Sequence, residues 1–193
     1  YVELSSPLFP SKFGDRQNIP YTNLKNIKNF NLNLDNKIFK DLIYLPFGKY
    51  DFGCVKEIKN ILKNNYIKKP ISLMNYLNRS KILVCSYPET PLYEGILTGP
   101  TILLYDFGSD LIHNKFKETF EELSKHKVIF KSTEEASEHI NKGWDDVDDW
   151  WYSKDVKGVI NEFMKQTCMT SNNSINVWSN FLVDHINKKK NII

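Results

Sequence analysis

Residues 81–105 read KILVCSYPETPLYEGILTGPTILLY. This stretch predicts a buried strand over 81–87, a short helix over 90–97 that ends before Gly99-Pro100, and a second buried strand over 101–105. Strands that are uniformly apolar and are joined through a helix are typical of a parallel sheet whose two faces are both covered. We therefore expect an α/β protein.

The same alternation continues on both sides of this stretch. A short apolar run at Leu42–Leu45, closed by Pro46, predicts another buried strand, and Val128–Phe130 predicts a further one. Ser72–Leu77 is expected to form a short helix. Ser132 and Glu135 have the spacing of a capping box, in which the serine accepts from the first-turn amides and the glutamate reaches back. Three sets of apolar residues with helical spacing follow it: Ala136, Ile140, Trp144, Val147 and Trp151; Val156, Val159, Ile160, Phe163 and Met164; Trp178, Phe181, Leu182 and His185.

The composition is that of a globular protein. Of the 193 residues, 41% are apolar and 25% are charged, which excludes wholesale disorder, and the formal net charge is +3. We expect an irregular segment over 1–40 that borders a missing neighbouring domain, one α/β domain over 41–187, and a frayed tail over 188–193.

Charge and cysteine usage limit the partners and the compartment. Arginine occurs only at Arg16 and Arg79, and the lysines are spread along the chain. Proteins that bind nucleic acid concentrate basic side chains on one face and favour arginine, so we expect no nucleic-acid partner. No apolar run approaches the length of a membrane span. Three cysteines without a Cys-x-x-Cys pair favour a cytoplasmic protein, and association with the inner membrane stays open.

The junction after the strand over 81–87 is the best candidate for a binding site, because ligands of parallel sheets bind beyond the carboxyl ends of the strands. Ser86 and Tyr87 end that strand. Thr90 is expected to be the N-cap of the next helix and Pro91 its first residue, so that free amides and the Thr90 hydroxyl can hold a phosphate. Glu94, one turn later, can accept hydrogen bonds from a ribose. The alternative is that Thr90 only caps the helix and Glu94 only interacts with its dipole, and the spacing does not separate the two.

His113 is the histidine best placed for acid–base or phosphate chemistry. It lies in the polar loop after the strand over 101–105, at the edge of the sheet where the phosphate site is expected. We name it as the candidate catalytic residue, which would assist the leaving group. His126, His139 and His185 fall in helical patterns and are expected to be structural or solvated.

An acidic cluster suggests a metal site, since it contains an Asp-x-Asp motif: Asp145, Asp146, Asp148 and Asp149. Carboxylates two residues apart on a helix point in divergent directions, so we expect a solvated helical face and no bound metal. The neighbouring tryptophans offer a stacking platform, but their helical spacing favours packing against the sheet: Trp144, Trp150 and Trp151.

Two stretches resemble known families. The series formed by Ser86, Thr90, Glu94, Gly99-Pro100 and Tyr105-Asp106 is similar to the donor-side signature of GT-B glycosyltransferases. Residues 132–153 read STEEASEHINKGWDDVDDWWYS and resemble the C-terminal end of a family of bacterial surface-carbohydrate transferases, first named from a leptospiral O-antigen locus. The core of that family is Asn-Lys-x-Trp-Asp-Asp-Val-x-x-Trp-Trp-x-Ser. It is matched at Asn141, Lys142, Trp144, Asp145, Asp146, Val147, Trp150, Trp151 and Ser153.

The resemblance covers residues 42–165 and implies a Rossmann-like fold. This fold would be a three-layer parallel sheet with C-terminal helices, the C-terminal half of a GT-B fold, and the N-terminal acceptor half would be missing. The resemblance also implies that the residues of the junction bind a nucleotide-sugar: Ser86, Tyr87, Thr90, Pro91, Glu94 and Asp106.

The implied reaction is metal-independent transfer of a sugar from a nucleotide-sugar onto a glycan or lipid-linked acceptor, in bacterial surface polysaccharide synthesis. No cofactor is expected, because helix-end amides and side chains stabilise the leaving group. Three alternatives stay open. The chain can be a degenerate nucleotide-binding scaffold, a glycerophosphotransferase-like polymer enzyme, or a metal-dependent transferase in which Asp146 and Asp148 converge on an ion.

Overall fold

The computed structural model describes residues 19–45, 55–65, 72–86, 88–105, 113–168 and 173–190. The chain divides into two units, with the boundary between Ile160 and Asn161. The helices are α1 (Ile19–Asn33), α2 (Asn36–Asp41), α3 (Val55–Leu62), α4 (Leu73–Leu77), α5 (Thr90–Thr98), α6 (Lys117–Lys125), α7 (Thr133–Gly143), α8 (Val147–Tyr152), α9 (Lys154–Thr167) and α10 (Ser174–Lys190), with 3₁₀ turns η2 (Lys63–Asn65) and η3 (Asn114–Phe116).

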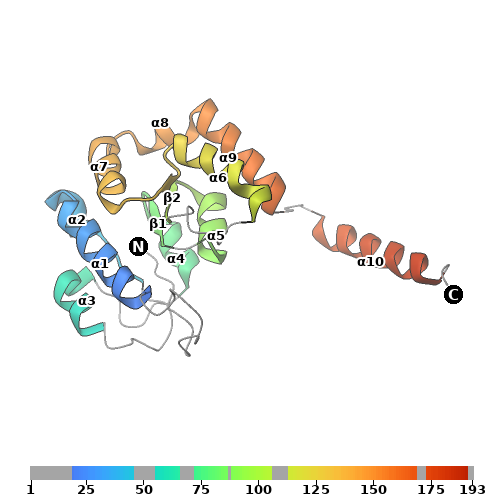
Figure 1. Ribbon diagram of the computed structural model, residues 1–193, viewed down its shortest axis with the longest axis horizontal. Coiled ribbons are helices and arrows are strands. Elements are labelled where there is room, and N and C mark those ends of the chain that lie inside the picture. Colours follow the sequence, from blue (N-terminus) through green and yellow to red (C-terminus); the bar gives the residue numbers. More distant parts are fainter. Residues whose placement is uncertain are drawn as a thin grey trace. The chain divides into compact units, whose positions relative to one another are not determined.

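The first unit is built on a parallel sheet of three strands in the order β1 (Leu83–Cys85), β2 (Thr101–Leu104) and β3 (Ile129–Phe130), as Figure 1 shows in part. Every residue of these strands is buried. The strands predicted over 81–87, 101–105 and 128–130 are therefore confirmed, although each is shorter than predicted, and the α/β class is confirmed with them.

Alternate strand residues face two different helical layers. Val84, Ile102 and Leu104 belong to a buried cluster with residues of α1 and α7. Leu83 and Thr101, which have the opposite parity, lie against Gly95 of α5. Because successive side chains of a strand point to opposite faces, α1 and α7 cover one face of the sheet and α5 covers the other. The apolar character of both faces in the sequence follows from these two layers.

The segment expected to be irregular over 1–40 contains helix α1 and most of helix α2 in its described part, so that prediction is wrong for the residues of these helices. Helix α1 packs against α7 and α3. It contributes Ile27 and Phe30 to the core, and Ile38 of α2 joins them, each at most 4% exposed. The spacing of these apolar residues is helical. The residues between them are rich in asparagine, which has a low helix propensity, so the sequence does not predict a helix here.

The strand predicted at Leu42–Leu45 is also wrong. Only Tyr44 and Leu45 adopt a β-bridge, outside the three-stranded sheet, and the Tyr44 N–H donates to the Asn65 carbonyl oxygen at 2.8 Å. Both side chains are nonetheless buried. The apolar run therefore predicts the burial of these two residues correctly, but the sheet strand that it predicts does not form. A short apolar run does not distinguish a strand from another kind of buried segment.

Helix α10, in the second unit, carries large apolar side chains that are exposed: Ile175, Val177, Trp178, Phe181, Leu182, Val183 and Ile186. Its helical form agrees with the predicted periodicity, and it continues to Lys190, three residues into the stretch predicted to fray. In the part of the chain that the structure describes, no helix combines the length and the apolar character of a membrane span.

Candidate nucleotide site at the carboxyl edge of the sheet

The carboxyl ends of the three parallel strands lie at one edge of the sheet, after Cys85, Leu104 and Phe130. Ser86, which follows β1, is partly buried. Burial raises the pKa of the neighbouring Cys85 thiol to about 12, so this cysteine is a protonated core residue rather than a nucleophile. The chemistry at this edge therefore depends on the loops that leave the strands and on the helices that begin there.

Helix α5 begins at Thr90, the first residue of the helix predicted over 90–97, so its N-cap lies one residue earlier than predicted. Glu89 is its N-cap, with extended backbone angles (φ −122°, ψ −166°), so Thr90 is the first helical residue and Pro91 the second. The predicted role of Thr90 as N-cap is therefore wrong. No side-chain hydrogen bond from Glu89 caps the helix, while the Leu92 N–H donates to the Glu89 carbonyl oxygen at 2.9 Å.

Thr90 and Glu94 lie four residues apart on α5 and share one face of the helix. Thr90 is exposed and Glu94 is partly exposed, so neither is sealed in the core. A hydroxyl at the start of a helix and a carboxylate one turn later provide a donor for a phosphate and an acceptor for sugar hydroxyls. This arrangement is compatible with both interpretations drawn from the sequence.

His113 is exposed and serves as the N-cap of η3. Its Nδ1 accepts a hydrogen bond from the Lys115 N–H at 3.2 Å. An accepting Nδ1 places the proton of the neutral ring on Nε2, which can then donate to an anionic group. A neutral His113 ring would therefore donate through Nε2, because its Nδ1 is used in local structure.

Helix α7, which follows β3, provides a contrast because its N-terminus is filled by its own side chains. The Ser132 Oγ accepts from the Glu135 N–H at 3.3 Å, which confirms Ser132 as the cap. The carboxylate that returns to the helix start is that of Glu134, not of Glu135: it accepts from the Ser132 and Thr133 hydroxyls, each at 2.9 Å, and from the Asn29 amide at 3.2 Å. Its own backbone N–H and then these groups lower the pKa of Glu134.

Two helices of the described part thus begin at the carboxyl edge directly after a strand, and they differ in how their first amides are satisfied. At α7 a carboxylate of the chain already occupies the position that an anion would take. At α5 the side chain of the N-cap residue, Glu89, makes no capping hydrogen bond within the described part of the chain. The α5 end is therefore the better candidate for an external phosphate, although the exposed Glu89 carboxylate adds negative charge beside it.

Two of the predicted site residues, Tyr87 and Asp106, lie outside the described residues. The aspartates predicted to lie on one continuous helix do not: Asp145 and Asp146 are in the turn between α7 and α8, and Asp148 is in α8. Among the described residues no group of three His, Cys, Asp or Glu side chains is arranged to hold a metal ion.

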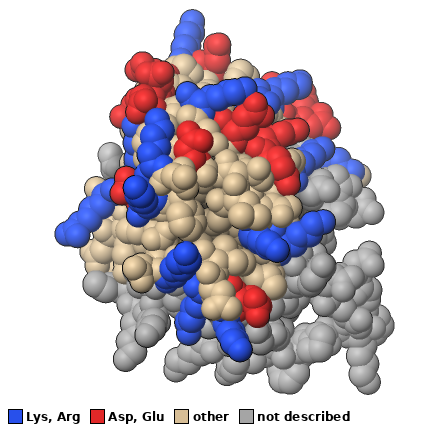
Figure 2. Space-filling view, turned by 90° about the vertical axis from the view of Figure 1, so that its left-hand side faces the viewer, with Lys and Arg blue, Asp and Glu red and all other residues tan. Residues whose placement is uncertain are grey.

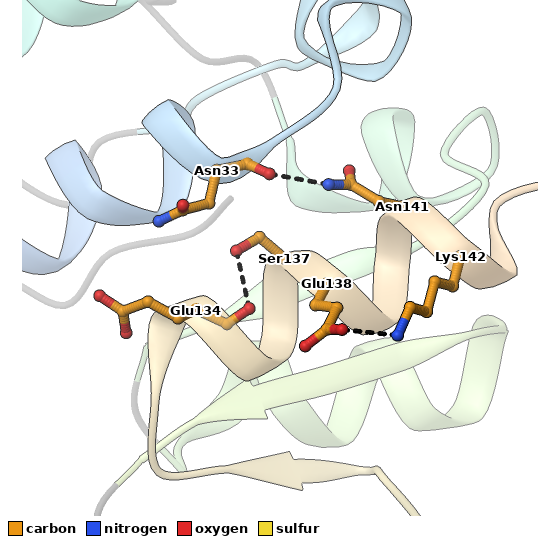
Figure 3. Close-up of polar contacts among 6 residues, drawn as sticks. All are labelled: Asn33, Glu134, Ser137, Glu138, Asn141 and Lys142. Atoms are coloured by element: carbon orange, nitrogen blue, oxygen red, sulfur yellow. Dashed lines mark hydrogen bonds and ion pairs between the residues drawn. The ribbon is translucent and has the colours of Figure 1, made fainter.

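The first residue of the Asn-Lys-x-Trp stretch, Asn141, makes two hydrogen bonds at the junction of α1 and α2. The Asn141 Nδ2 donates to the Asn33 carbonyl oxygen at 2.7 Å, and its Oδ1 accepts from the Asp35 N–H at 2.9 Å. Asn141 on α7 thus satisfies the end of α1 and the turn into α2 at the same time, and Figure 3 shows the first of these bonds. Lys142, the next residue, forms an exposed ion pair with Glu138.

Replacing Asn141 with aspartate is expected to lower the free energy of unfolding by about 1–3 kcal/mol, because a carboxylate cannot donate to the Asn33 carbonyl oxygen. Urea unfolding followed by circular dichroism measures the loss. Lys142→Gln is the control, since its exposed ion pair contributes little. Equal stability of the Asn141→Asp variant and the wild type would contradict a stabilising role for the hydrogen bond from the Asn141 Nδ2 to the Asn33 carbonyl oxygen.

The remaining tryptophans of the core pack as the sequence predicts. Trp151 is fully buried, and the Trp150 Nε1 donates to the His126 carbonyl oxygen at 3.1 Å. The half-buried His139 ring lies 5.3 Å from Phe130 and 4.8 Å from Trp150, measured between ring centroids. The interpretation of His139 as a structural residue is therefore confirmed.

His139 is expected to make the stability of the fold depend on pH. Burial and then the positive charge of Lys127 lower the pKa of His139 below its usual 6.5. Because the folded state disfavours the protonated ring, the contribution of His139 is complete above about pH 6.5 and is lost as the pH falls through its folded pKa. Urea midpoints measured on both sides of this range should fall less for His139→Gln than for the wild type. Identical pH profiles would contradict the assignment.

The sequence did not identify the polar rim at the opposite, amino edge of the sheet, where Arg79 and Lys81 border a cavity beside Trp144. The sequence feature that could have indicated this rim is a pair of basic residues directly before a buried strand. Such pairs are common on protein surfaces, so this one does not by itself predict a binding site.

Comparison with known proteins agrees with the resemblance at the level of the reaction type. A family model described as LIC12162 family transferase matches residues 15–182. No curated protein and no solved structure matches the chain. Because the family match spans most of the 193 residues, the chain belongs to the LIC12162 family of transferases.

Proposed function

We propose that the chain is the donor-binding half of a metal-independent, GT-B-type glycosyltransferase of bacterial surface polysaccharide synthesis. Its sheet would be the Rossmann-like half of that fold. The donor is a nucleotide-sugar, and a glycan or lipid-linked acceptor would bind to a separate N-terminal half. The protein would act in the cytoplasm, with contact to the inner membrane through its acceptor.

One observation carries this proposal: in a transferase of parallel α/β architecture, α5 begins at the carboxyl edge of the sheet without a capping hydrogen bond from the side chain of its N-cap residue, Glu89. Its N-terminus and the Thr90 hydroxyl would meet the phosphates, and Glu94 on the same helical face would accept from the ribose. Ser86 and Pro91 flank these groups, Tyr87 and Asp106 complete the proposed set, and the His113 Nε2–H would assist the leaving group.

The experiment is calorimetric titration of the full chain with CMP, UDP and GDP. Glu94→Gln is expected to weaken binding of the preferred nucleotide by about tenfold or more, because a charged acceptor of hydrogen bonds is lost. Glu118→Gln, an exposed glutamate in the first turn of α6, is the matched control and should bind as the wild type does. Glu89→Gln should strengthen binding a few-fold, because it removes a negative charge beside the phosphates.

Absence of binding to all three nucleotides would contradict the proposal. The Glu89 carboxylate at the helix start favours one alternative, a degenerate module that keeps the cleft as a scaffold without turnover. That alternative predicts that Glu94→Gln leaves the activity of the longer transferase unchanged. The glycosyltransferase proposal predicts that the activity falls.

A further inference from the structure

A cavity of about 330 Å³ lies at the amino edge of the sheet, away from the proposed donor loop. Its lining comes from α1, α2, α4, α7 and the residues that lead into β1. Phe30, Val84 and Ile140 form part of its apolar interior and are each at most 4% exposed. Arg79 and Lys81 also line it and are exposed, so the cavity extends from the core to the protein surface.

The size and the lining are those of a small-ligand site. Pockets that hold small molecules have volumes of about 300–1,000 Å³, are mostly apolar, and contain a few polar groups that orient the ligand. This cavity is at the lower end of that range. The polar side chains of its lining are few: Asp41, Tyr76, Arg79, Ser80, Lys81 and Trp144.

The rim of the cavity carries an excess of positive charge. Arg79 and Lys81 are two residues apart, and in the described part of the chain neither forms an ion pair with a carboxylate. The Lys81 Nζ lies 5.0 Å from the centroid of the Trp144 ring, which holds the ammonium group beside the cavity. Among the described residues that line the cavity, Asp41 is the single carboxylate.

The neighbouring surface has the same character. On the face that carries α1 and α2, lysine and arginine side chains border a broad uncharged area, and most carboxylates gather toward its upper end (Figure 2). A second hollow of about 340 Å³ shares Ser80 and Lys81 with the cavity and is lined by Asn78, Thr98 and Asp148 among others. A headgroup bound at Lys81 therefore has space on the polar side.

We propose that this cavity binds a single-chain anionic amphiphile, with the apolar chain in the buried interior and the phosphate or carboxylate headgroup at Arg79 and Lys81. The apolar interior favours the chain by the hydrophobic effect, and the guanidinium group can pair with the two oxygens of such a headgroup. This site is independent of the donor site at the carboxyl edge, so either can exist without the other.

The probe is dodecyl phosphate, titrated below its micelle concentration into the full chain and followed by calorimetry and tryptophan fluorescence. Binding is expected to be saturable. Dodecyl maltoside, which has the same chain and no charge, and inorganic phosphate, which has the charge and no chain, should each bind about tenfold more weakly or not at all.

The double variant Arg79→Gln/Lys81→Gln should weaken binding of dodecyl phosphate by about tenfold or more, since both headgroup contacts are lost. Lys117→Gln on α6, an exposed lysine that does not line the cavity, is the matched control. Leu42→Trp should fill the apolar part and abolish binding. Circular dichroism identifies a variant that fails to fold, and in that case the double variant alone decides.

Three outcomes would overturn the proposal. They are no saturable binding of dodecyl phosphate, equal binding of dodecyl maltoside, and unchanged binding by the folded double variant. Failure of nucleotide titration does not affect this test, because the two sites share no residue.

Discussion

Replacing Gly95 with alanine is expected to lower the free energy of unfolding by about 1–3 kcal/mol, although alanine is the better helix former. A Cβ at this position would overlap the Leu83 side chain and would lie 2.7 Å from the Thr101 Oγ1. Thr101 is fully buried in β2, and its hydroxyl donates to the Gly99 carbonyl oxygen at 3.1 Å. Because both neighbours are buried, the added methyl group forces these side chains or α5 itself to shift.

Gly158→Ala on α9 is the matched control. A Cβ added there meets nothing within 4 Å, so the substitution should stabilise the helix by about 0.5–1 kcal/mol. The two glycine variants should therefore shift the urea midpoint in opposite directions. A stabilising Gly95→Ala would mean that α5 does not pack closely on β1 and β2.

Gly95 also links stability to the proposed function, because it lies next to Glu94 on the helix whose start would hold the phosphates. If the added methyl group displaces α5, nucleotide binding should weaken together with stability. The larger Gly95→Val variant should lose both to a greater extent, since it adds two further carbons at the same close contact.

The sheet could be predicted from the sequence because its strands are apolar without alternation and are separated by proline and glycine. Gly99-Pro100 ends α5 where predicted, and Thr101–Leu104 is buried as predicted. Helix α1 could not be recognised, because its apolar residues are diluted by asparagine. Its stability comes from packing against α7, a contact between segments about one hundred residues apart that local pattern does not contain.

The candidate site could be predicted at the level of the sheet edge and not at the level of individual hydrogen bonds. A parallel sheet brings the ends of β1 and β2 to one edge, so the sequence correctly predicts that Glu94 lies on the helix that begins there. The choice between Glu89 and Thr90 as N-cap depends on the backbone angles of a single residue. At α7 the carboxylate that accepts hydrogen bonds at the helix start is likewise that of Glu134, whereas the sequence predicts that of Glu135.

Three residues in the stretch 141–153 make hydrogen bonds that connect different elements of the fold. Asn141 joins α7 to the end of α1, the Trp150 indole donates to the loop before β3, and Ser153 Oγ accepts from the Val156 N–H at the start of α9. These residues connect elements from both ends of the first unit.

Trp151 should be the most sensitive position of this stretch. Its side chain is fully buried, and the ring lies 5.4 Å from that of Trp150, measured between centroids. Trp151→Ala is expected to lower the free energy of unfolding by about 3–5 kcal/mol, because it removes a large buried surface and leaves a cavity. Domains of this size have total stabilities of about 5–15 kcal/mol, so the variant should be partly unfolded at room temperature or close to it.

Trp151→Phe distinguishes packing from hydrogen bonding. The Trp151 Nε1 is buried and has no hydrogen-bond partner in the described part of the chain, whereas the Trp150 Nε1 donates to the His126 carbonyl oxygen. Phenylalanine at 151 removes an unsatisfied donor, which offsets part of the lost packing, while phenylalanine at 150 removes a made hydrogen bond. Urea unfolding should therefore show that Trp151→Phe retains most of the stability that Trp151→Ala loses. If Trp151→Phe and Trp151→Ala lower the free energy of unfolding by the same amount, the Trp151 Nε1 has a hydrogen-bond partner. Trp151 then stabilises the fold through that bond rather than through its volume.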